Sequence, residues 1–218
     1  SPCIIMFTGG STGTPKGGLH AHRQPVNRFR WMLAAHPPGP QEVFAARPVV
    51  SVMPALWEQL GGLCCGVPTR LLDRAALRDP ARYLAALSDA GVTRMTVTPA
   101  LMRVLLTELE RDGAAPPPPL SLLTIGGEPL SDRLLARLQA ALPGSAILED
   151  YGATEVNPIG AALRVRDGTP VFAPISGVEV AVADAEGAPL SAGQEGELCV
   201  AGEGLALCYW GDTALTEA

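Results

Sequence analysis

Residues 3–17 read CIIMFTGGSTGTPKG, an apolar run that passes into a loop rich in glycine and hydroxyl side chains. The apolar run over residues 3–7 predicts a buried strand, and the glycines after it predict a loop. Residues 8–17 contain four glycines, four hydroxyl side chains and Lys16. Such a loop directs backbone N–H groups, hydroxyl donors and a cation at one volume, which is what a polyphosphate requires. A merely flexible turn does not call for hydroxyls and a lysine in this order, so we interpret the loop as phosphate-binding.

The order of residues in this loop differs from that of a Walker loop. A Walker lysine follows a glycine and precedes Ser or Thr at the start of a helix. In this chain Lys16 follows Pro15. A P-loop ATPase or GTPase is therefore disfavoured.

Helical and strand patterns alternate along the middle of the chain. The expected strands cover residues 69–72, 94–98, 120–125 and 146–148. The expected helices cover residues 57–63 and 83–90, a segment with Leu101, Val104 and Leu105 on one face, and a segment after the N-cap Ser131. Strands separated by helices predict an α/β fold, with a parallel-type sheet that helices cover on both faces.

The pattern changes near residue 165. Val178, Val180 and Val182 alternate with other residues, which is typical of antiparallel strands. We therefore expect two parts. Residues 1–165 would form part of an α/β subdomain, and residues 166–218 would form a small antiparallel β-rich subdomain.

Composition and charge disfavour several classes of protein. The 218 residues include 16 Lys and Arg against 22 Asp and Glu, and the net charge of -6 disfavours a nucleic-acid partner. Hydrophobic residues make up 47%, which is enough for a substantial core. No apolar run approaches the roughly 18 to 20 residues of a membrane span, and no secretory signal is recognisable, so we expect no membrane partner and a cytoplasmic location. The five cysteines lack zinc-site spacing and are expected to be reduced and mostly buried.

Four segments of the chain occur in a recognisable order. They are residues 7–17 with His22-Arg23, then Gly126-Gly127-Glu128, then Tyr151-Gly152-Ala153-Thr154-Glu155, and then Gly196-Glu197-Leu198 with Gly202 and Tyr209. Together they resemble the adenylate-forming superfamily, and within it the adenylation domains of nonribosomal peptide synthetases. Enzymes of this family activate a carboxylic acid with ATP, release pyrophosphate, and pass the acyl group from the acyl-adenylate to a thiol. The resemblance implies ATP and Mg²⁺ as cofactors. It implies as partners a small-molecule carboxylic acid and a peptidyl or acyl carrier protein with its phosphopantetheine thiol.

The resemblance also implies roles for individual residues. The phosphates would be held by Thr8, Gly10, Ser11, Thr12, Gly13 and Lys16. The adenine would lie among Gly126, Gly127, Glu128 and Tyr151, with Thr154 on the α-phosphate and Glu155 on Mg²⁺. The catalytic residues would be Thr12, Lys16 and Thr154, which stabilise charge on the phosphates as pyrophosphate leaves. A carboxylate suits a hard cation, and an aromatic ring beside glycines suits a purine. Taken alone, Tyr151 would more often be a core aromatic residue and Glu155 a solvated charge.

The acyl pocket is where the chain departs from its relatives. Aligning Trp57-Glu58 with the family's corresponding pair places Met53 where amino-acid-activating members keep an aspartate for the α-ammonium. An ammonium buried without its counter-ion costs on the order of 3 to 5 kcal/mol, so an acid that lacks the α-amine is favoured. An α-keto acid is the first choice, and aryl and hydroxy acids are further options. The other lining positions are Trp57, Leu123, Ile125, Asp150, Pro158 and Ile159.

Several alternatives stay open at this point. Asp150 could pair with a substrate cation, as in a β-amino or basic acid, and Met53 could be core packing if the alignment slips by a residue or two. The chain could also be a catalytically inactive pseudo-adenylation module that serves as a structural platform, or a stand-alone acyl-CoA or aryl ligase. Retention of the phosphate loop with Thr154 and Glu155 favours an enzyme over a platform. The family's mobile C-terminal subdomain has no counterpart in the chain, so we expect activity to require the remaining adenylation-domain segments.

Overall fold

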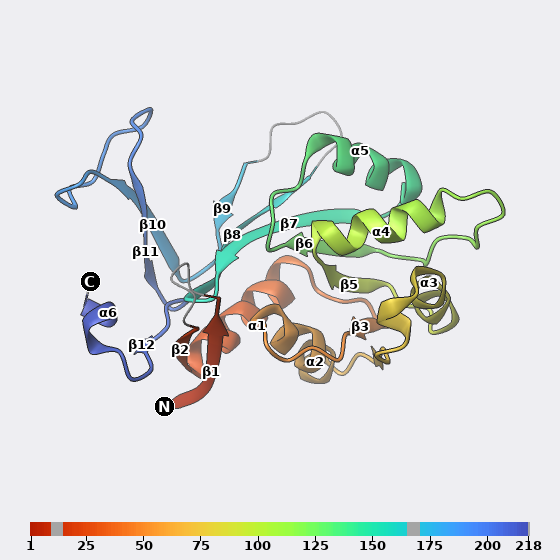
Figure 1. Cartoon of the computed structure of the whole chain (residues 1–218), viewed down its shortest axis with the longest axis horizontal. Helices are drawn as coiled ribbons and strands as arrows, with labels where there is room; N and C mark the ends of the chain where they lie inside the picture. The colour runs from red at the N-terminus through yellow and green to blue at the C-terminus, as the bar shows by residue number, and fades with distance from the viewer. Residues whose placement is uncertain (10–14, 165–170, 218) are drawn as a thin grey trace.

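The computed structural model describes residues 1–9, 15–164 and 171–217. Its largest sheet contains β3 (Phe44–Ala46), β4 (Thr69–Leu71), β5 (Arg94–Val97), β6 (Leu122–Gly126), β7 (Ala146–Ala153), β8 (Val156–Leu163) and β9 (Ala173–Pro174). The strands lie in the order β4-β3-β5-β6-β7-β8-β9. The strands from β4 to β7 pair in parallel, whereas β8 and β9 are antiparallel to their neighbours. The expected α/β fold with a mostly parallel sheet is confirmed (Figure 1).

Helices cover both faces of this sheet. They are α1 (Arg23–Ala35), α2 (Pro54–Cys65), α3 (Pro80–Asp89), α4 (Pro99–Leu109) and α5 (Asp132–Ala141), with a short 3-10 helix over Ala76–Arg78. Three of them begin with proline, which suits the first turn because the N–H that proline lacks has no partner there. The side chain of Ser131 accepts a hydrogen bond from the Leu134 N–H, so the expected N-cap of α5 is confirmed. Helix α1 has no counterpart among the helices expected from the sequence.

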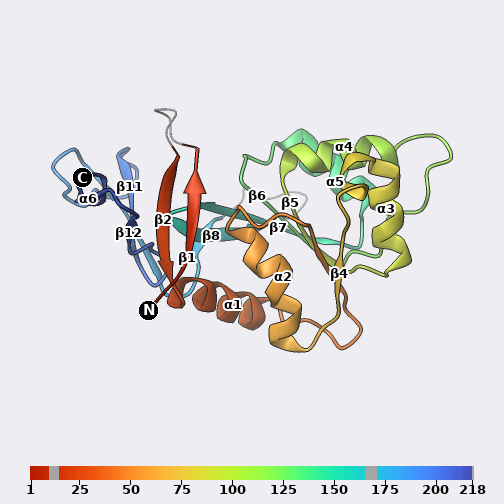
Figure 2. The ribbon, with the colours of Figure 1, turned by 60° about the horizontal axis from the view of Figure 1, so that its bottom comes forward.

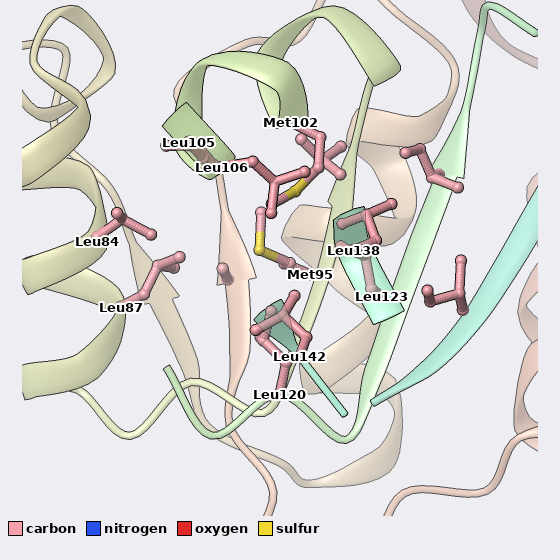
Figure 3. Close-up of a cluster of buried hydrophobic side chains, with 14 of the residues drawn as sticks. Leu84, Leu87, Met95, Met102, Leu105, Leu106, Leu120, Leu123, Leu138 and Leu142 are labelled. Atoms are coloured by element: carbon pink, nitrogen blue, oxygen red, sulfur yellow. The ribbon is translucent and has the colours of Figure 1, made fainter. Parts of the chain in front are cut away.

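The larger hydrophobic core lies between the sheet and α3, α4 and α5. Leu123 of β6 lies there among Met95, Met102, Leu106 and Leu138, as Figure 3 shows. Its neighbour Leu122 belongs instead to a second core under α1 and α2. Successive residues of a strand point to opposite faces of the sheet, so β3, β6 and β7 each contribute to both cores.

Two smaller antiparallel sheets lie beside the parallel sheet, as Figure 2 shows. One contains β1 (Pro2–Thr8), β2 (Lys16–Ala21) and β12 (Cys208–Tyr209), and the other contains β10 (Val178–Ala183) and β11 (Glu197–Gly202). A short helix α6 (Thr213–Glu217) follows β12. The antiparallel strands expected near the C-terminus are therefore present, and β12 adds to the hairpin at the N-terminus. The division at residue 165 stays a prediction.

Two expectations about burial are wrong. Within residues 3–7 the structure buries Met6, but Phe7 is 62% exposed, because β1 belongs to the small sheet rather than to the covered parallel sheet. The cysteines are not mostly buried, since Cys3, Cys64 and Cys199 are exposed. None of the helices in the described part of the chain combines the length and apolar character that crossing a bilayer requires.

Candidate functional site

A cavity of about 360 Å³ lies at the carboxyl ends of β3, β5, β6 and β7. Open parallel sheets commonly bind ligands at this edge, where the loops after several strands converge. Of the residues expected at the site, the cavity lining includes Met53, Gly126, Gly127, Asp150 and Thr154. Residues assigned to the nucleotide and residues assigned to the acid therefore meet at one cavity.

The connection between β3 and α2 forms an apolar side of this cavity. Met53 precedes Pro54 at the start of α2 and is 5% exposed. Val49, Val52 and Pro54 line the cavity beside it. Among the described residues that this connection contributes to the lining, none is acidic. The described residues of this connection that line the cavity beside Met53 therefore offer no carboxylate to an amine.

The acidic group of the cavity is Asp150, and it is already paired. Its Oδ2 accepts a hydrogen bond from Arg28 Nη2 at 3.1 Å, and the two side chains are 8% and 3% exposed. Burial raises the pKa of the Asp150 carboxyl, while the positive charge of Arg28 opposes that rise. Oδ1 lies against Gly126, where any side chain would collide with the carboxylate. Position 126 must therefore be glycine for the Asp150 side chain to keep this position.

The residue before Asp150, Glu149, anchors the loop that follows Gly126 at the end of β6. Glu149 is 7% exposed, and its Oε1 accepts a hydrogen bond from the Leu130 N–H at 3.1 Å. Its Oε2 accepts from Arg164, which also pairs with Asp132 at the start of α5. This network ties β7, β8 and the loop between β6 and α5 together at the edge of the cavity.

A second group of candidate residues lies at the sheet formed by β1, β2 and β12, where Lys16, Glu155 and Tyr209 are close together. Lys16 begins β2, and its Nζ lies 5.9 Å from the centre of the Tyr209 ring. The Tyr209 hydroxyl donates a hydrogen bond to Glu155 Oε1 at 2.6 Å, which raises the pKa of Tyr209 to about 12. Glu155 Oε2 has no hydrogen-bond donor among the residues that the structure describes.

These side chains fit a magnesium nucleotide. Mg²⁺ is commonly bound through phosphates with only one or two protein carboxylates, so the single carboxylate of Glu155 is sufficient. Within residues 1–9, 15–164 and 171–217 no cluster of three metal-ligating side chains provides an alternative metal site. Tyr151 is 54% exposed on β7, so its ring is accessible for stacking on a purine. Thr154 lies in the turn between β7 and β8 and lines the cavity.

The other described residues expected to bind the nucleotide do not line this cavity. Thr8 ends β1 and pairs with Lys16 across the hairpin. Glu128 lies outside the cavity lining and forms an exposed ion pair with Arg103 at 3.2 Å. Gly10, Ser11, Thr12 and Gly13 lie outside the described residues.

The structure does not bring the other predicted pocket residues to this cavity. Trp57 packs against Phe29 and Phe44 in the core under α1 and α2, with ring centres 5.2 and 5.6 Å away. Leu123 and Ile125 are fully buried on the opposite face of the sheet, against α3 to α5. Pro158 and Ile159 are buried in β8, where Ile159 joins a small cluster with Val178. In β6 only the end of the strand, at Gly126, reaches the cavity.

The cavity lining also includes residues that are not among those expected from the sequence. Arg47 follows β3, and its Nε donates to Glu58 Oε2 at 3.0 Å in a buried pair. Thr98 follows β5 and caps α4. A threonine before proline at the end of a strand is a recognisable helix start, so Thr98 could have been found. Arg28 carries no such signal, because one arginine in a helix usually lies in solvent.

Comparisons with known proteins identify the family of the chain. The family model described as AMP-binding enzyme matches residues 1–210. Phosphinothricin tripeptide synthetase PhsB of Streptomyces viridochromogenes is 34% identical in an alignment of length 217, which covers 97% of this chain and 18% of that protein. The crystal structure of CmiS6 matches with a TM-score of 0.84 at 29% identity, over 99% of this chain and 52% of that chain. The complex structure of VinN with L-aspartate matches with a TM-score of 0.83 at 25% identity, over 99% and 54%.

The chain therefore spans about half the length of the solved structures that it matches and a smaller part of the synthetase. The family model nevertheless covers nearly all of the chain, and the fold agrees over almost its full length. The chain belongs to the AMP-binding enzyme family, and within it resembles the adenylation-domain core of nonribosomal peptide synthetases, as its four motifs predicted.

Proposed function

We propose that the chain supplies the nucleotide- and acyl-binding part of an ATP-dependent ligase that activates a carboxylic acid as its acyl-adenylate. One observation carries this proposal: a single cavity is lined by Gly126 and Thr154 of the nucleotide motifs and by Met53 and Asp150 of the acyl pocket. Two reactants must be held within bonding distance of each other, and a shared cavity meets that need.

In the proposed reaction, a carboxylate oxygen of the acid attacks the α-phosphorus of ATP. A new oxygen–phosphorus bond forms, the bond from the α-phosphorus to the bridging oxygen breaks, and pyrophosphate leaves. Two anions approach each other, so the site must offset negative charge. We assign Thr154 to the α-phosphate, and Thr12 and Lys16 to the departing phosphates. Glu155 would hold Mg²⁺, which neutralises phosphate charge when bound.

We further propose that the acid lacks an α-amine. Met53 is 5% exposed and lines the cavity with Val52 and Pro54, so its thioether takes the place of a carboxylate in apolar surroundings. An α-ammonium there would lose water without gaining a counter-ion. An α-keto acid avoids that cost and is the favoured class, ahead of hydroxy and aryl acids.

A second candidate is an acid whose amine is held by Asp150 rather than by residue 53. The complex of VinN with L-aspartate favours it, because that related protein binds an acid that carries an amine. The pairing of Asp150 with Arg28 opposes it, because the carboxylate already has a cation at 3.1 Å. We therefore rank this candidate second.

The proposed acceptor of the acyl group is the phosphopantetheine thiol of a carrier protein, in line with the similarity to a peptide synthetase. Coenzyme A is the alternative acceptor, and transfer from the adenylate to either thiol can be compared directly. A platform without activity is the alternative to an enzyme. It predicts that ATP does not bind, whereas the enzyme predicts that it does.

The test is ATP–pyrophosphate exchange by the full-length protein, with matched pairs of 2-oxo and 2-amino acids that share one carbon skeleton. We expect the 2-oxo member of each pair to give the larger kcat/KM. Met53→Asp should shift the ratio toward the 2-amino acid by roughly two to three decades, whereas the apolar control Met53→Leu should leave the ratio unchanged. A preference of the unmodified protein for 2-amino acids would refute the assignment of Met53, and a lack of exchange with every acid would refute the enzyme.

A further inference from the structure

The charges around the acyl part of the cavity are balanced within the protein. Arg28 comes from α1 and Asp150 from β7, and their side chains meet at 3.1 Å with almost no exposure to water. Asp150 lines the cavity together with Met53. The pair therefore presents no net charge to a ligand in this cavity.

We propose that Arg28 determines substrate specificity by neutralising Asp150, so that the cavity rejects acids that carry an amine. This inference rests on the proposed function, because it assumes that the acid lies in this cavity. The carboxylate of Asp150 is the acidic group of the lining that an ammonium could use. An ammonium drawn to it would also approach the guanidinium of Arg28, and the repulsion offsets much of the attraction.

The orientation of Asp150 supports this role. Oδ2 accepts from Arg28, while Oδ1 lies against Gly126, which itself lines the cavity. Arg28 therefore occupies one oxygen of the carboxylate, and the other oxygen lies against a glycine of the cavity lining. Without the positive charge of Arg28, the same oxygen near Gly126 would become an unneutralised partner for a cation.

The experiment compares the full-length protein with Arg28→Gln, which keeps a hydrogen-bond donor but removes the charge. ATP–pyrophosphate exchange is measured with butanoate and 3-aminobutanoate, which differ only in the amine. We expect Arg28→Gln to raise the ratio of kcat/KM for 3-aminobutanoate over butanoate by roughly ten- to hundredfold. Arg28→Lys keeps the charge and should keep the ratio of the unmodified protein. The double variant Arg28→Gln/Asp150→Asn should lose the gain.

The proposal is overturned if Arg28→Gln folds, as judged by its melting temperature, and the ratio does not rise. It is also overturned if the double variant shows the same rise, since Asp150 would then not be the partner of the amine.

If Arg28→Gln does not fold, Asp150→Asn gives the complementary test. It leaves the positive charge of Arg28 beside the cavity, so the ratio of succinate over butanoate should rise, and an unchanged ratio contradicts the proposal. If no acid supports exchange in the unmodified protein, the proposed function fails; if acids are activated but the ratios do not respond, only the role of Arg28 fails.

Discussion

Removing the guanidinium of Arg164 should destabilise the folded chain strongly, because it leaves a buried carboxylate without its counter-ion. Glu149 is 7% exposed and accepts hydrogen bonds from Arg164 and from the Leu130 N–H. In Arg164→Met the Leu130 N–H remains, but the positive charge is lost. The other partner of Arg164, Asp132, is 99% exposed at its side chain and stays solvated.

The magnitude follows from this burial. Breaking a buried ion pair by removing one partner costs about 3 to 5 kcal/mol, because the remaining charge stays desolvated. The ion pair with Asp132 adds little, since exposed pairs are weak. For a chain of this size, that loss corresponds to a fall in melting temperature of about 6 to 20 °C.

Urea unfolding of the purified chain, followed by circular dichroism, measures the change. The double variant Arg164→Met/Glu149→Gln should recover most of the lost stability, because a neutral amide can still accept from Leu130 and needs no counter-ion. Arg137→Met is the matched control, since it removes an arginine from an exposed pair with Glu110 and should have a far smaller effect. The reasoning is refuted if Arg164→Met loses no more stability than the control, or if the double variant is as unstable as the single one.

Two further predictions concern His20 and Tyr209. His20 is fully buried, and burial lowers its pKa below the value of about 6.5 in an unfolded chain. The unfolded state then binds the proton more readily, so the free energy of unfolding should fall as the pH drops below that value. His20→Val should reduce this fall when urea unfolding is measured from pH 7.5 to 5.5. Equal pH profiles for the two proteins would contradict the assignment. Tyr209→Phe removes the hydroxyl that donates to Glu155 Oε1 at 2.6 Å but keeps the ring near Lys16. Because Glu155 is the proposed ligand of Mg²⁺, the full-length variant should need several-fold more Mg²⁺ for half-maximal ATP binding in calorimetry. Its melting temperature should change little. An unchanged Mg²⁺ requirement would show that the hydroxyl does not position Glu155.

Much of the fold could be predicted because its signals are local. The expected strand over residues 94–98 corresponds to β5, and the expected helix over 83–90 corresponds to α3, with boundaries within a few residues. Ser131 caps α5 as expected, because an N-cap depends only on residues of one helical turn. The helix α1 was missed, although it covers one face of the sheet and contributes Arg28.

The site was predicted less completely, because lining a cavity depends on which face of a strand a residue occupies. Leu123 and Ile125 were expected in the pocket, but both point into the core under α4 and α5. Met53 and Asp150 line the cavity, and their assignment to an acyl pocket stays a prediction. The substrate class assigned to that pocket stays a prediction until the exchange assay is done.

The sequence by itself determined the family, the phosphate-loop motif and the alternation of helices and strands between residues 69 and 148, because each of these depends on residue types at short spacing. Only the tertiary structure decided how the charges beside the cavity are paired. Arg28 and Asp150 are separated by 122 residues and come together because α1 and β7 pack in one fold. A local pattern carries no information about such a contact, and it is this contact that determines whether an acidic side chain can serve a ligand or is already neutralised by the protein.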